Sequence, residues 1–130
     1  MLVLGLDRLD YTKGIPERLF AFEKLLEKQP DVYGKISLVQ VVIPSRLNVP
    51  EYQELKNQLE FLAGRINGRF SNSGWIPIHY QFRTLDKIQL VGHYKASDIA
   101  LITPLRDGMN LVSKEYCASS SDNRGVIILS

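Results

Sequence analysis

Runs of apolar residues alternate with amphipathic helical patterns along the whole 130-residue sequence. Five apolar runs read as buried strands, at residues 2–6, 36–43, 75–82, 98–102 and 126–129. Between the first two runs, Leu19, Phe22 and Leu26 recur at helical spacing, and similar patterns fill the later gaps. Strongly apolar strands separated by helices are typical of a parallel sheet with helices on both faces. The sequence therefore predicts an α/β fold built on a Rossmann-like, five-stranded parallel sheet.

Capping residues and helix breakers predict where the helices begin and end. Pro16 suits the first turn of the first helix. Thr84 and Asn110 are the candidate N-caps of the third and fourth helices. The second helix is expected to carry one apolar stripe and to weaken at its end, as indicated by Tyr52, Leu55, Leu59, Leu62, Gly64, Asn67 and Gly68. The third is expected to carry Leu85, Ile88, Val91 and Tyr94. A turn over residues 122–125 leads to the last strand.

Composition limits the classes of function. The length predicts one domain, and 45% hydrophobic with 23% charged residues is typical of soluble globular proteins. A net charge of +2 does not indicate a nucleic acid or membrane partner, and no apolar run approaches a membrane span. Cys117 is the only cysteine, which suits a reducing, cytoplasmic location, and His79 and His93 form no ligand cluster with it. Strand residues that start directly after Met1 and end next to Ser130 suggest a piece of a longer chain.

The first loop at the predicted carboxyl edge of the sheet carries two cations. Ligands bind at this edge in open α/β sheets, where we expect the polar loops over residues 7–14, 44–48, 83–86 and 104–110. Arg8 and Lys13, with a helix start behind them, would form a pyrophosphate clamp. The alternative is a solvated loop in which these cations pair with Asp7 and Asp10. The patterns of a Walker A loop and of a Gly-x-Gly-x-x-Gly loop are both missing.

The loop after the fourth strand combines a carboxylate, a glycine and a helix start. Gly108 allows backbone shapes that other residues avoid and lets a ligand approach the main chain. Asp107 and Asn110 can both read hydroxyl groups, and the first N–H groups of the following helix suit a phosphate. The alternative is an ordinary capped helix after a strand.

Several longer motifs, in order along nearly the whole chain, add a family resemblance. The two longest are Gly5-Leu-Asp-Arg-Leu-Asp-Tyr-Thr-Lys-Gly14 and Arg106-Asp-Gly-Met-Asn-Leu-Val-Ser-Lys-Glu-Tyr116. Shorter ones are Val42-Ile-Pro-Ser-Arg46, Glu51-Tyr52, Gly64-Arg-Ile-Asn-Gly68 and Trp75-Ile-Pro-Ile78. With these motifs the chain resembles the trehalose-6-phosphate synthases, which are retaining glycosyltransferases of family 20 with a GT-B fold.

The resemblance implies an activity and a place within a larger enzyme. Family members transfer glucose from UDP-glucose to glucose 6-phosphate, without a metal or other cofactor, in a cleft between two Rossmann-like domains. Residues 1–130 would be the truncated donor-binding domain, half of a GT-B fold, with the N-terminal acceptor domain absent. Such a fragment is expected to be inactive alone. A homo-oligomeric full-length protein is compatible with the resemblance.

Two alternatives and one choice of substrate stay open. The parent protein could be a non-catalytic regulatory relative that only binds a nucleotide sugar. It could also be a glucosylglycerol-phosphate synthase, with glycerol 3-phosphate as the acceptor. The sequence does not choose between UDP, ADP and GDP donors. Neither nucleic acid nor a membrane is an expected partner.

The resemblance also implies roles for individual residues. Arg8 and Lys13 would hold the donor pyrophosphate and stabilise the leaving UDP. Asp107 would bind glucose hydroxyls together with the neighbouring Gly108, Met109 and Asn110, which also meet the phosphate edge. Retention would proceed by same-face attack, with the leaving phosphate taking the acceptor's proton. This route fits the absence of a second motif carboxylate that could act as nucleophile.

The remaining implied contacts surround the nucleotide and the acceptor. Leu85 would lie in the loop whose backbone meets uracil, and Leu111 and Val112 would offer helix-start N–H groups. Glu115 would accept hydrogen bonds from the ribose hydroxyls, and Arg46 would reach the phosphate of glucose 6-phosphate. Read from the residues alone, Glu115 could instead be a surface helix residue beside Lys114, and Arg46 a solvated loop residue.

Overall fold

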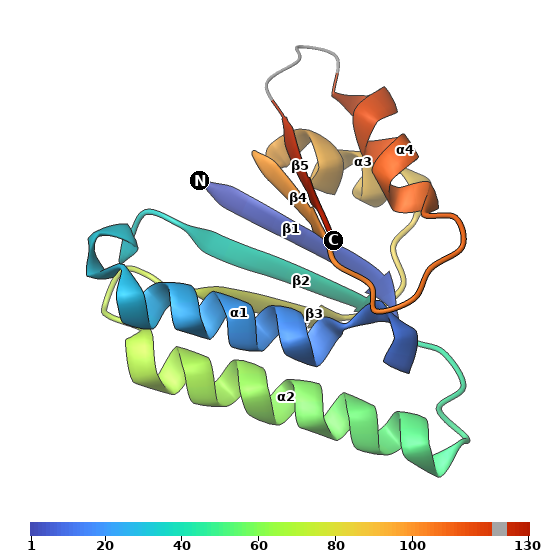
Figure 1. The fold of residues 1–130 in the computed structure, drawn as a ribbon, viewed down its shortest axis with the longest axis horizontal. Helices are drawn as coiled ribbons and strands as arrows, with labels where there is room; N and C mark the ends of the chain where they lie inside the picture. Colours follow the sequence, from blue (N-terminus) through green and yellow to red (C-terminus); the bar gives the residue numbers. More distant parts are fainter. Residues whose placement is uncertain (121–124) are drawn as a thin grey trace.

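A single parallel sheet organises the structure, a computed structural model that describes residues 1–120 and 125–130. Its five strands lie in the order β3-β2-β1-β4-β5 (Figure 1). They are β1 (Leu2–Arg8), β2 (Ser37–Ile43), β3 (Ile78–Phe82), β4 (Ile99–Ile102) and β5 (Val126–Leu129). The central β1 pairs in parallel with β2 along its whole length and with β4 on its other side. The predicted α/β fold with a five-stranded parallel sheet is confirmed.

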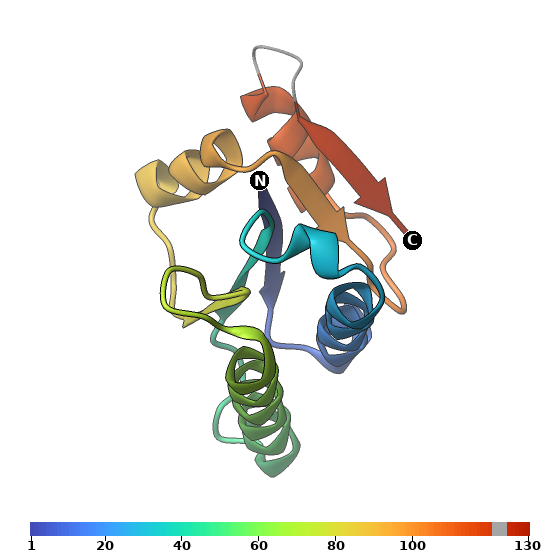
Figure 2. The same cartoon turned by 90° about the vertical axis from the view of Figure 1, so that its left-hand side faces the viewer.

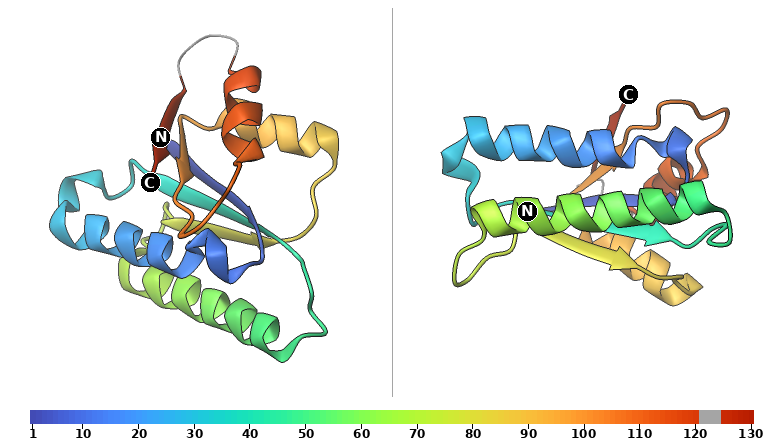
Figure 3. Two further views of the ribbon diagram at one scale, coloured as in Figure 1. Left: turned by 45° about the vertical axis from the view of Figure 1, so that its right-hand side comes forward. Right: turned by 90° about the horizontal axis from the view of Figure 1, so that it is seen from below.

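Helices cover both faces of the sheet. They are α1 (Ile15–Lys28), α2 (Pro50–Phe70), α3 (Lys87–Ala96) and α4 (Leu111–Ser119), with short 3₁₀ turns η1 (Tyr11–Lys13) and η2 (Pro30–Val32). α1 and α2 run side by side on one face, and α3 and α4 lie on the other (Figures 1, 2 and 3). Because strand side chains alternate, Val3 packs in the core under α1 and α2, whereas Leu4 and Leu6 pack in the core under α3 and α4.

Two loops meet where the strand order reverses beside β1. The loop after β1 and the loop after β4 leave the carboxyl ends of neighbouring strands. Their backbones join, since Leu105 N donates to Thr12 O at 2.8 Å and Arg106 N donates to the same oxygen at 3.2 Å. Gly14 adopts a left-handed φ of 66°, and a Cβ there would lie 2.6 Å from Thr103 O. A glycine is therefore needed where the two loops touch.

A buried polar cluster lies directly behind these loops, and we refer to its members as the Arg18 cluster. It consists of Asp7, Arg18, Gln40 and Thr103. The Arg18 guanidinium donates to the Asp7 carboxylate through Nη1, to Gln40 Oε1 at 3.0 Å, and through Nε to Thr103 Oγ1 at 3.1 Å. A Cβ on Gly5 would lie 2.8 Å from Arg18 Nη1, so the strand makes room for the cluster by lacking a side chain there. The cluster thereby ties the ends of β1 and β4 to α1.

The predicted ends of β1, α2 and β3 differ from the observed ones by two residues or more. β1 continues to Arg8 because it pairs with β2 as far as Ile43. α2 continues to Phe70, past the glycines expected to weaken it. The amide of Asn67 donates to Ile78 O and accepts from Ile78 N, both at 2.9 Å, and this tertiary contact outweighs the low helix propensity. β3 begins only at Ile78, because Trp75 belongs to a preceding turn bridged to Asn72.

The start of α3 was predicted wrongly. Its N-cap is Asp86 rather than Thr84, and Asp86 forms a capping box with Gln89. The predicted apolar stripe is also wrong: Ile88 is 85% exposed, Val91 is also exposed, and Tyr94 is the buried residue of the helix. The hydrogen-bonding cap at Asp86 therefore marks the start of this helix, and its apolar residues do not mark the buried face.

The other predicted elements are confirmed, including α1, α4 and β5. α1 begins at Ile15, one residue before the predicted Pro16. Residues 122–124 of the predicted turn before β5 lie outside the described residues. Among the helices that the structure describes, none is long and apolar enough to cross a membrane.

Candidate functional site

A cavity of about 350 Å³ opens at the carboxyl ends of β1 and β4, between the two loops that follow them. It is lined by Leu6, Asp7, Arg8, Lys13, Asp107, Met109, Asn110, Leu111 and Val112. Seven of these residues were predicted to belong to a site, and the fold brings them together from positions about 100 apart in sequence. Leu6 and Asp7 were not predicted as site residues, although Asp7 directly follows an apolar run and so marks a strand end.

An ion pair in the cavity joins its two loops. Lys13 Nζ lies 3.1 Å from Asp107 Oδ2, and both side chains are largely buried. Asn110 Nδ2 donates to the same oxygen at 3.0 Å. The hydrogen bond from Lys13 lowers the pKa of Asp107 below its ordinary value, and its charge, Asn110 and the Met109 N–H add to this effect. The Asp107 carboxylate therefore stays ionised at neutral pH and can only accept hydrogen bonds.

Arg8 stands at the mouth of the cavity with a largely exposed side chain. Its Nη2 lies 3.3 Å from Asp10 Oδ2, as the alternative interpretation of this loop expected. Asp10 caps η1 by accepting from Thr12 N at 2.8 Å and from Thr12 Oγ1 at 2.6 Å. Lys13, by contrast, pairs with Asp107 rather than with Asp7 or Asp10, and Asp7 pairs with Arg18. An exposed ion pair such as that of Arg8 is weak, so this guanidinium can turn to a ligand at little cost.

The fourth helix begins as predicted. Asn110 is its N-cap, and its Oδ1 accepts from Ser113 N at 2.9 Å. This bond uses the N–H of the third helical residue. The N–H groups of Leu111 and Val112, the first two helical residues, have no acceptor within the helix. Both residues line the cavity, and their N–H groups carry the partial positive charge of a helix start.

Gly108 does not use the backbone freedom expected of it, whereas its expected place beside a ligand stays a prediction. Its φ lies outside the left-handed range, which among the described glycines only Gly14 and Gly34 adopt. A Cβ on Gly108 would meet no atom within 4 Å, so an alanine fits the observed backbone. Conformational freedom is instead needed at Gly14, which directly precedes α1 after the basic loop. That position could have been found from the sequence as a glycine before a helix start.

Glu115 and Leu85 lie beyond the cavity lining, on the side of α3. Glu115 follows Leu111 and Val112 by one helical turn and shares their face. Its Oε2 accepts from the Tyr94 hydroxyl at 2.7 Å. Leu85, in the loop after β3, packs partly buried against the core that contains Tyr94. Tyr94 was predicted only as an apolar helix residue, and nothing in the sequence signals its contact with a carboxylate.

Arg46 occupies a separate loop after β2 and does not line the cavity. It is the only non-glycine residue with a positive φ, 50°, among those the structure describes. Its Nη1 lies 3.4 Å from the Tyr52 hydroxyl, and its guanidinium lies 5.8 Å from the centre of the Tyr52 ring. Tyr52 in turn packs on Tyr11, with ring centres 5.6 Å apart. This aromatic contact links the Arg46 loop to the loop that carries Arg8 and Lys13.

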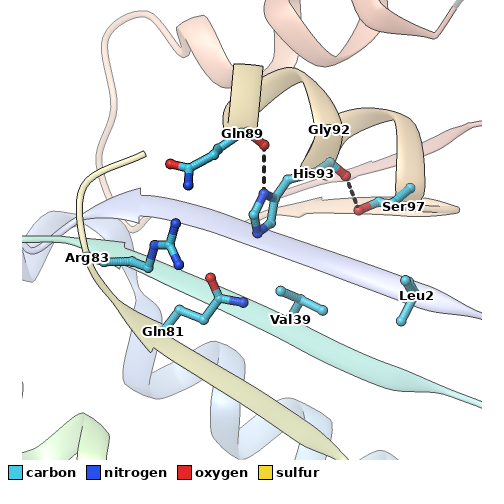
Figure 4. A pocket seen from close by; sticks show the side chains of 9 residues that line it. Leu2, Val39, Gln81, Arg83, Gln89, Gly92, His93 and Ser97 are labelled. Carbon is cyan, nitrogen blue, oxygen red and sulfur yellow. Dashed lines mark hydrogen bonds between the residues drawn. The ribbon is translucent and has the colours of Figure 1, made fainter. Parts of the chain in front are cut away.

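A second hollow of about 390 Å³ lies between α3 and the adjacent face of β2 and β3 (Figure 4). It is lined by Leu2, Val39, Gln81, Arg83, Gln89, Gly92, His93, Ala96 and Ser97. None of the predicted site residues belongs to this set. The His93 ring is held by Gln89 O at 2.8 Å within the same helix, in line with its expected structural role. In the described part of the chain, no group of three or more His, Cys, Asp or Glu side chains could hold a metal ion.

Comparisons with known proteins agree on one family. The model of glycosyltransferase family 20 matches residues 1–130. The chain is 52% identical over 129 residues to the UDP-forming alpha,alpha-trehalose-phosphate synthase A of Dictyostelium discoideum, covering 99% of the chain and 18% of that protein. It is 50% identical over 129 residues to the trehalose-6-phosphate synthase of Klebsiella pneumoniae, covering 98% of the chain and 27% of that protein.

Solved structures give the same result. The Escherichia coli trehalose-6-phosphate structure bound with UDP-2-fluoro glucose matches with a TM-score of 0.96 and 47% identity, over 99% of this chain and 29% of that one. A UDP-forming alpha,alpha-trehalose-phosphate synthase from Burkholderia xenovorans in complex with glucose-6-phosphate matches with a TM-score of 0.93 and 44% identity, over 98% and 28%. The chain therefore spans less than a third of the length of these relatives.

Proposed function

The chain belongs to glycosyltransferase family 20, and from this membership we propose that it is the donor-binding part of a trehalose-6-phosphate synthase. The complete enzyme transfers glucose from UDP-glucose to glucose 6-phosphate with retention of configuration. The missing N-terminal domain supplies the other wall of the cleft, so residues 1–130 alone bind the donor without transferring glucose. The observation that carries this proposal is the Lys13–Asp107 pair, which joins the two motif-bearing loops over one cavity.

The donor pyrophosphate binds across the two loops. Arg8 turns from Asp10 to the phosphates, and Lys13 shares its three donors between Asp107 and a phosphate oxygen. The N–H groups of Leu111 and Val112 complete the anion site. As the glycosidic bond breaks, negative charge develops on the leaving UDP, and these fixed donors stabilise it. The leaving phosphate takes the proton of the acceptor hydroxyl.

The sugar and the nucleoside bind on either side of the pyrophosphate. The ionised Asp107 accepts hydrogen bonds from glucose hydroxyls, with Gly108, Met109 and Asn110 beside it. The lowered pKa of Asp107 suits this role, because a protonated carboxyl group would itself donate a hydrogen bond and offer fewer acceptors to the hydroxyls. Glu115 accepts from the ribose hydroxyls, and the backbone around Leu85 meets uracil. UDP is the preferred nucleotide in this proposal, in keeping with the UDP-forming relatives.

Arg46 is proposed to bind the phosphate of glucose 6-phosphate. Its left-handed backbone supports a functional role, because such strain concentrates at ligand sites. Tyr52 holds the guanidinium from one side and leaves its other donors for a ligand. An arginine fork matches a phosphate with two parallel hydrogen bonds.

The proposed reaction needs no metal or other cofactor, since Arg8, Lys13 and the α4 start supply the charge stabilisation. We place it in the cytoplasm, because the one cysteine, Cys117, is a free thiol that suits a reducing compartment. No nucleic acid and no membrane takes part, and the full-length protein assembles with itself or acts alone. Glucose transfer that persists in excess EDTA supports metal independence, and loss of transfer that Mg²⁺ restores contradicts it.

Calorimetric titration of UDP into the 130-residue chain tests the donor site. The unmodified chain should bind UDP saturably, and Arg8→Ala should weaken binding about 10- to 100-fold, as expected for the loss of a charge-assisted hydrogen bond. Arg65→Ala, which removes an arginine on α2 far from the cavity lining, is the matched control and should leave the UDP affinity unchanged. No detectable binding at millimolar UDP contradicts a preformed donor site.

A transfer assay on a full-length protein carrying these residues tests the acceptor. Glucose 6-phosphate should accept glucose from UDP-glucose, and glycerol 3-phosphate should not. A product made only from glycerol 3-phosphate would refute the acceptor assignment. UDP binding without any transfer would support a regulatory relative instead.

A further inference from the structure

The Tyr94 hydroxyl makes a contact that the proposed function does not use. It donates to Glu115 Oε2 at 2.7 Å, and it reaches this carboxylate from α3, a different helix. Tyr94 is buried, and its ring packs edge-on against Tyr116 with centres 6.1 Å apart. Tyr94 belongs to the core under α3 and α4, and this packing restricts the movement of its ring.

Glu115 needs such a partner if it is to bind a ligand well. It is an exposed residue near the middle of a nine-residue helix, and a free glutamate side chain samples many rotamers. A hydrogen bond from a rigid donor restricts the carboxylate to one orientation before the ligand arrives. Tyr94 occupies Oε2, and a carboxylate has a second oxygen that can accept from a ligand. Restricting a side chain in its bound conformation increases affinity because less freedom is lost on binding.

The hydroxyls of the two buried tyrosines in this core make contacts of different kinds. A buried tyrosine hydroxyl usually finds a hydrogen-bond partner, which can be a backbone carbonyl or a side chain. The Tyr116 hydroxyl donates to such a carbonyl, Ser97 O, at 3.2 Å. Tyr94, by contrast, reaches a charged side chain one helical turn beyond the cavity lining. Burial of Tyr94 and its hydrogen bond to Glu115 both raise the pKa of its hydroxyl, so Tyr94 remains a donor throughout the neutral range.

We propose that Tyr94 is a positioning residue for nucleotide binding, which orients the Glu115 carboxylate toward the ribose hydroxyls of the donor. This inference rests on the proposed role of Glu115. It also connects two parts of the nucleotide site, because α3 begins directly after the loop that carries Leu85. In this proposal α3, which follows the loop that meets the base, carries Tyr94, and Tyr94 orients the carboxylate that binds the ribose.

The test compares UDP with 2′,3′-dideoxy-UDP, which lacks both ribose hydroxyls, by calorimetric titration into the 130-residue chain. Tyr94→Phe removes only the hydroxyl and keeps the ring that packs on Tyr116. It should weaken UDP binding about 3- to 10-fold and change the affinity for dideoxy-UDP less than about twofold. A loss of folding would weaken both ligands equally, so the ratio of the two affinities separates positioning from structure.

Three further variants complete the experiment. Glu115→Gln should weaken UDP more than dideoxy-UDP. The double variant with Tyr94→Phe should bind UDP no more weakly than Glu115→Gln alone, since the two residues act as one unit. Tyr116→Phe removes the other hydroxyl of the same core and should leave the UDP to dideoxy-UDP ratio unchanged.

The outcomes are distinct. If Tyr94→Phe binds UDP as tightly as the unmodified chain while Glu115→Gln binds it weakly, the inference is overturned and the proposed function still stands. An equal loss for both ligands in Tyr94→Phe also overturns it. Equal affinities of the unmodified chain for the two ligands refute the ribose role of Glu115, and the inference fails with it.

Discussion

Replacing Arg18 by methionine should destabilise the protein far more than the same change at other arginines. The Arg18 side chain is completely buried, and the Asp7 carboxylate that it neutralises is 6% exposed. Methionine fills a similar volume but donates no hydrogen bond. Asp7 would then be a buried carboxylate without its ionic partner, and Gln40 and Thr103 would each lose a donor.

The size of the effect follows from the burial. Removing one member of a buried ion pair typically costs about 3–5 kcal/mol, because the remaining charge is left uncompensated. For a 130-residue chain, an unfolding entropy of about 2.1 cal/mol/K per residue converts this loss to a fall in Tm of about 11–18 °C. That loss is a large share of the roughly 5–15 kcal/mol by which a domain of this size is stable.

Thermal unfolding followed by circular dichroism, with urea titration as a second measure, checks the prediction. Arg65→Met is the matched control: Arg65 is partly exposed, and its partner Glu23 keeps a second arginine, Arg69. It should cost no more than about 1 kcal/mol. The double variant Asp7→Asn, Arg18→Met removes both charges and should recover part of the loss. A fall in Tm below about 4 °C for Arg18→Met, equivalent to about 1 kcal/mol, would refute the account of this cluster.

Three further results are expected from single changes. Gly5→Ala should lower the unfolding free energy by about 1–3 kcal/mol in urea, because the new Cβ overpacks the Arg18 cluster. Asp86→Ala should cost about 1 kcal/mol through loss of the capping box, whereas Thr84→Ala should be nearly neutral, and equal losses would contradict the observed helix start. NMR titration should find the pKa of Asp107 below its ordinary value, with Lys13 as the main cause. A carboxyl group whose pKa is lowered in the folded state stabilises the fold at pH values above its unfolded pKa, and this contribution is lost as the pH falls through the folded-state pKa. Lys13→Met should therefore raise the pKa of Asp107 and make the free energy of unfolding depend less on pH in this acidic range.

The strands and the first and fourth helices could be predicted because their signals are local. Apolar runs identify buried strands whatever their partners, and Asn110 caps the helix that directly follows it. The end of α2 was predicted wrongly because a distant contact decides it. α2 extends to Phe70 because Asn67 bonds the backbone of β3, eleven residues away. The start of α3 was missed although its signal is local: Thr84 and Asp86 are both good caps, and only Asp86 has a glutamine at the position that closes the capping box.

The candidate site divides in the same way, between residues that would touch a ligand and residues that hold them in place. Lys13 and Asp107 stand in polar loops after strands, so their chemistry was readable from residue type and motif. Arg18 and Tyr94 lie on buried helix faces. There the sequence shows a charged or hydroxyl-bearing residue among apolar ones but does not show which residue it contacts. Arg18 follows Ile15 by three positions and precedes Phe22 by four, so a charge on the buried stripe of α1 could have been noticed. Its partners could not, because Thr103 is 85 residues away and comes within reach only through the parallel order of β1 and β4. The position of a ligand-binding loop therefore depends on buried polar contacts that become visible only once the strand order is known.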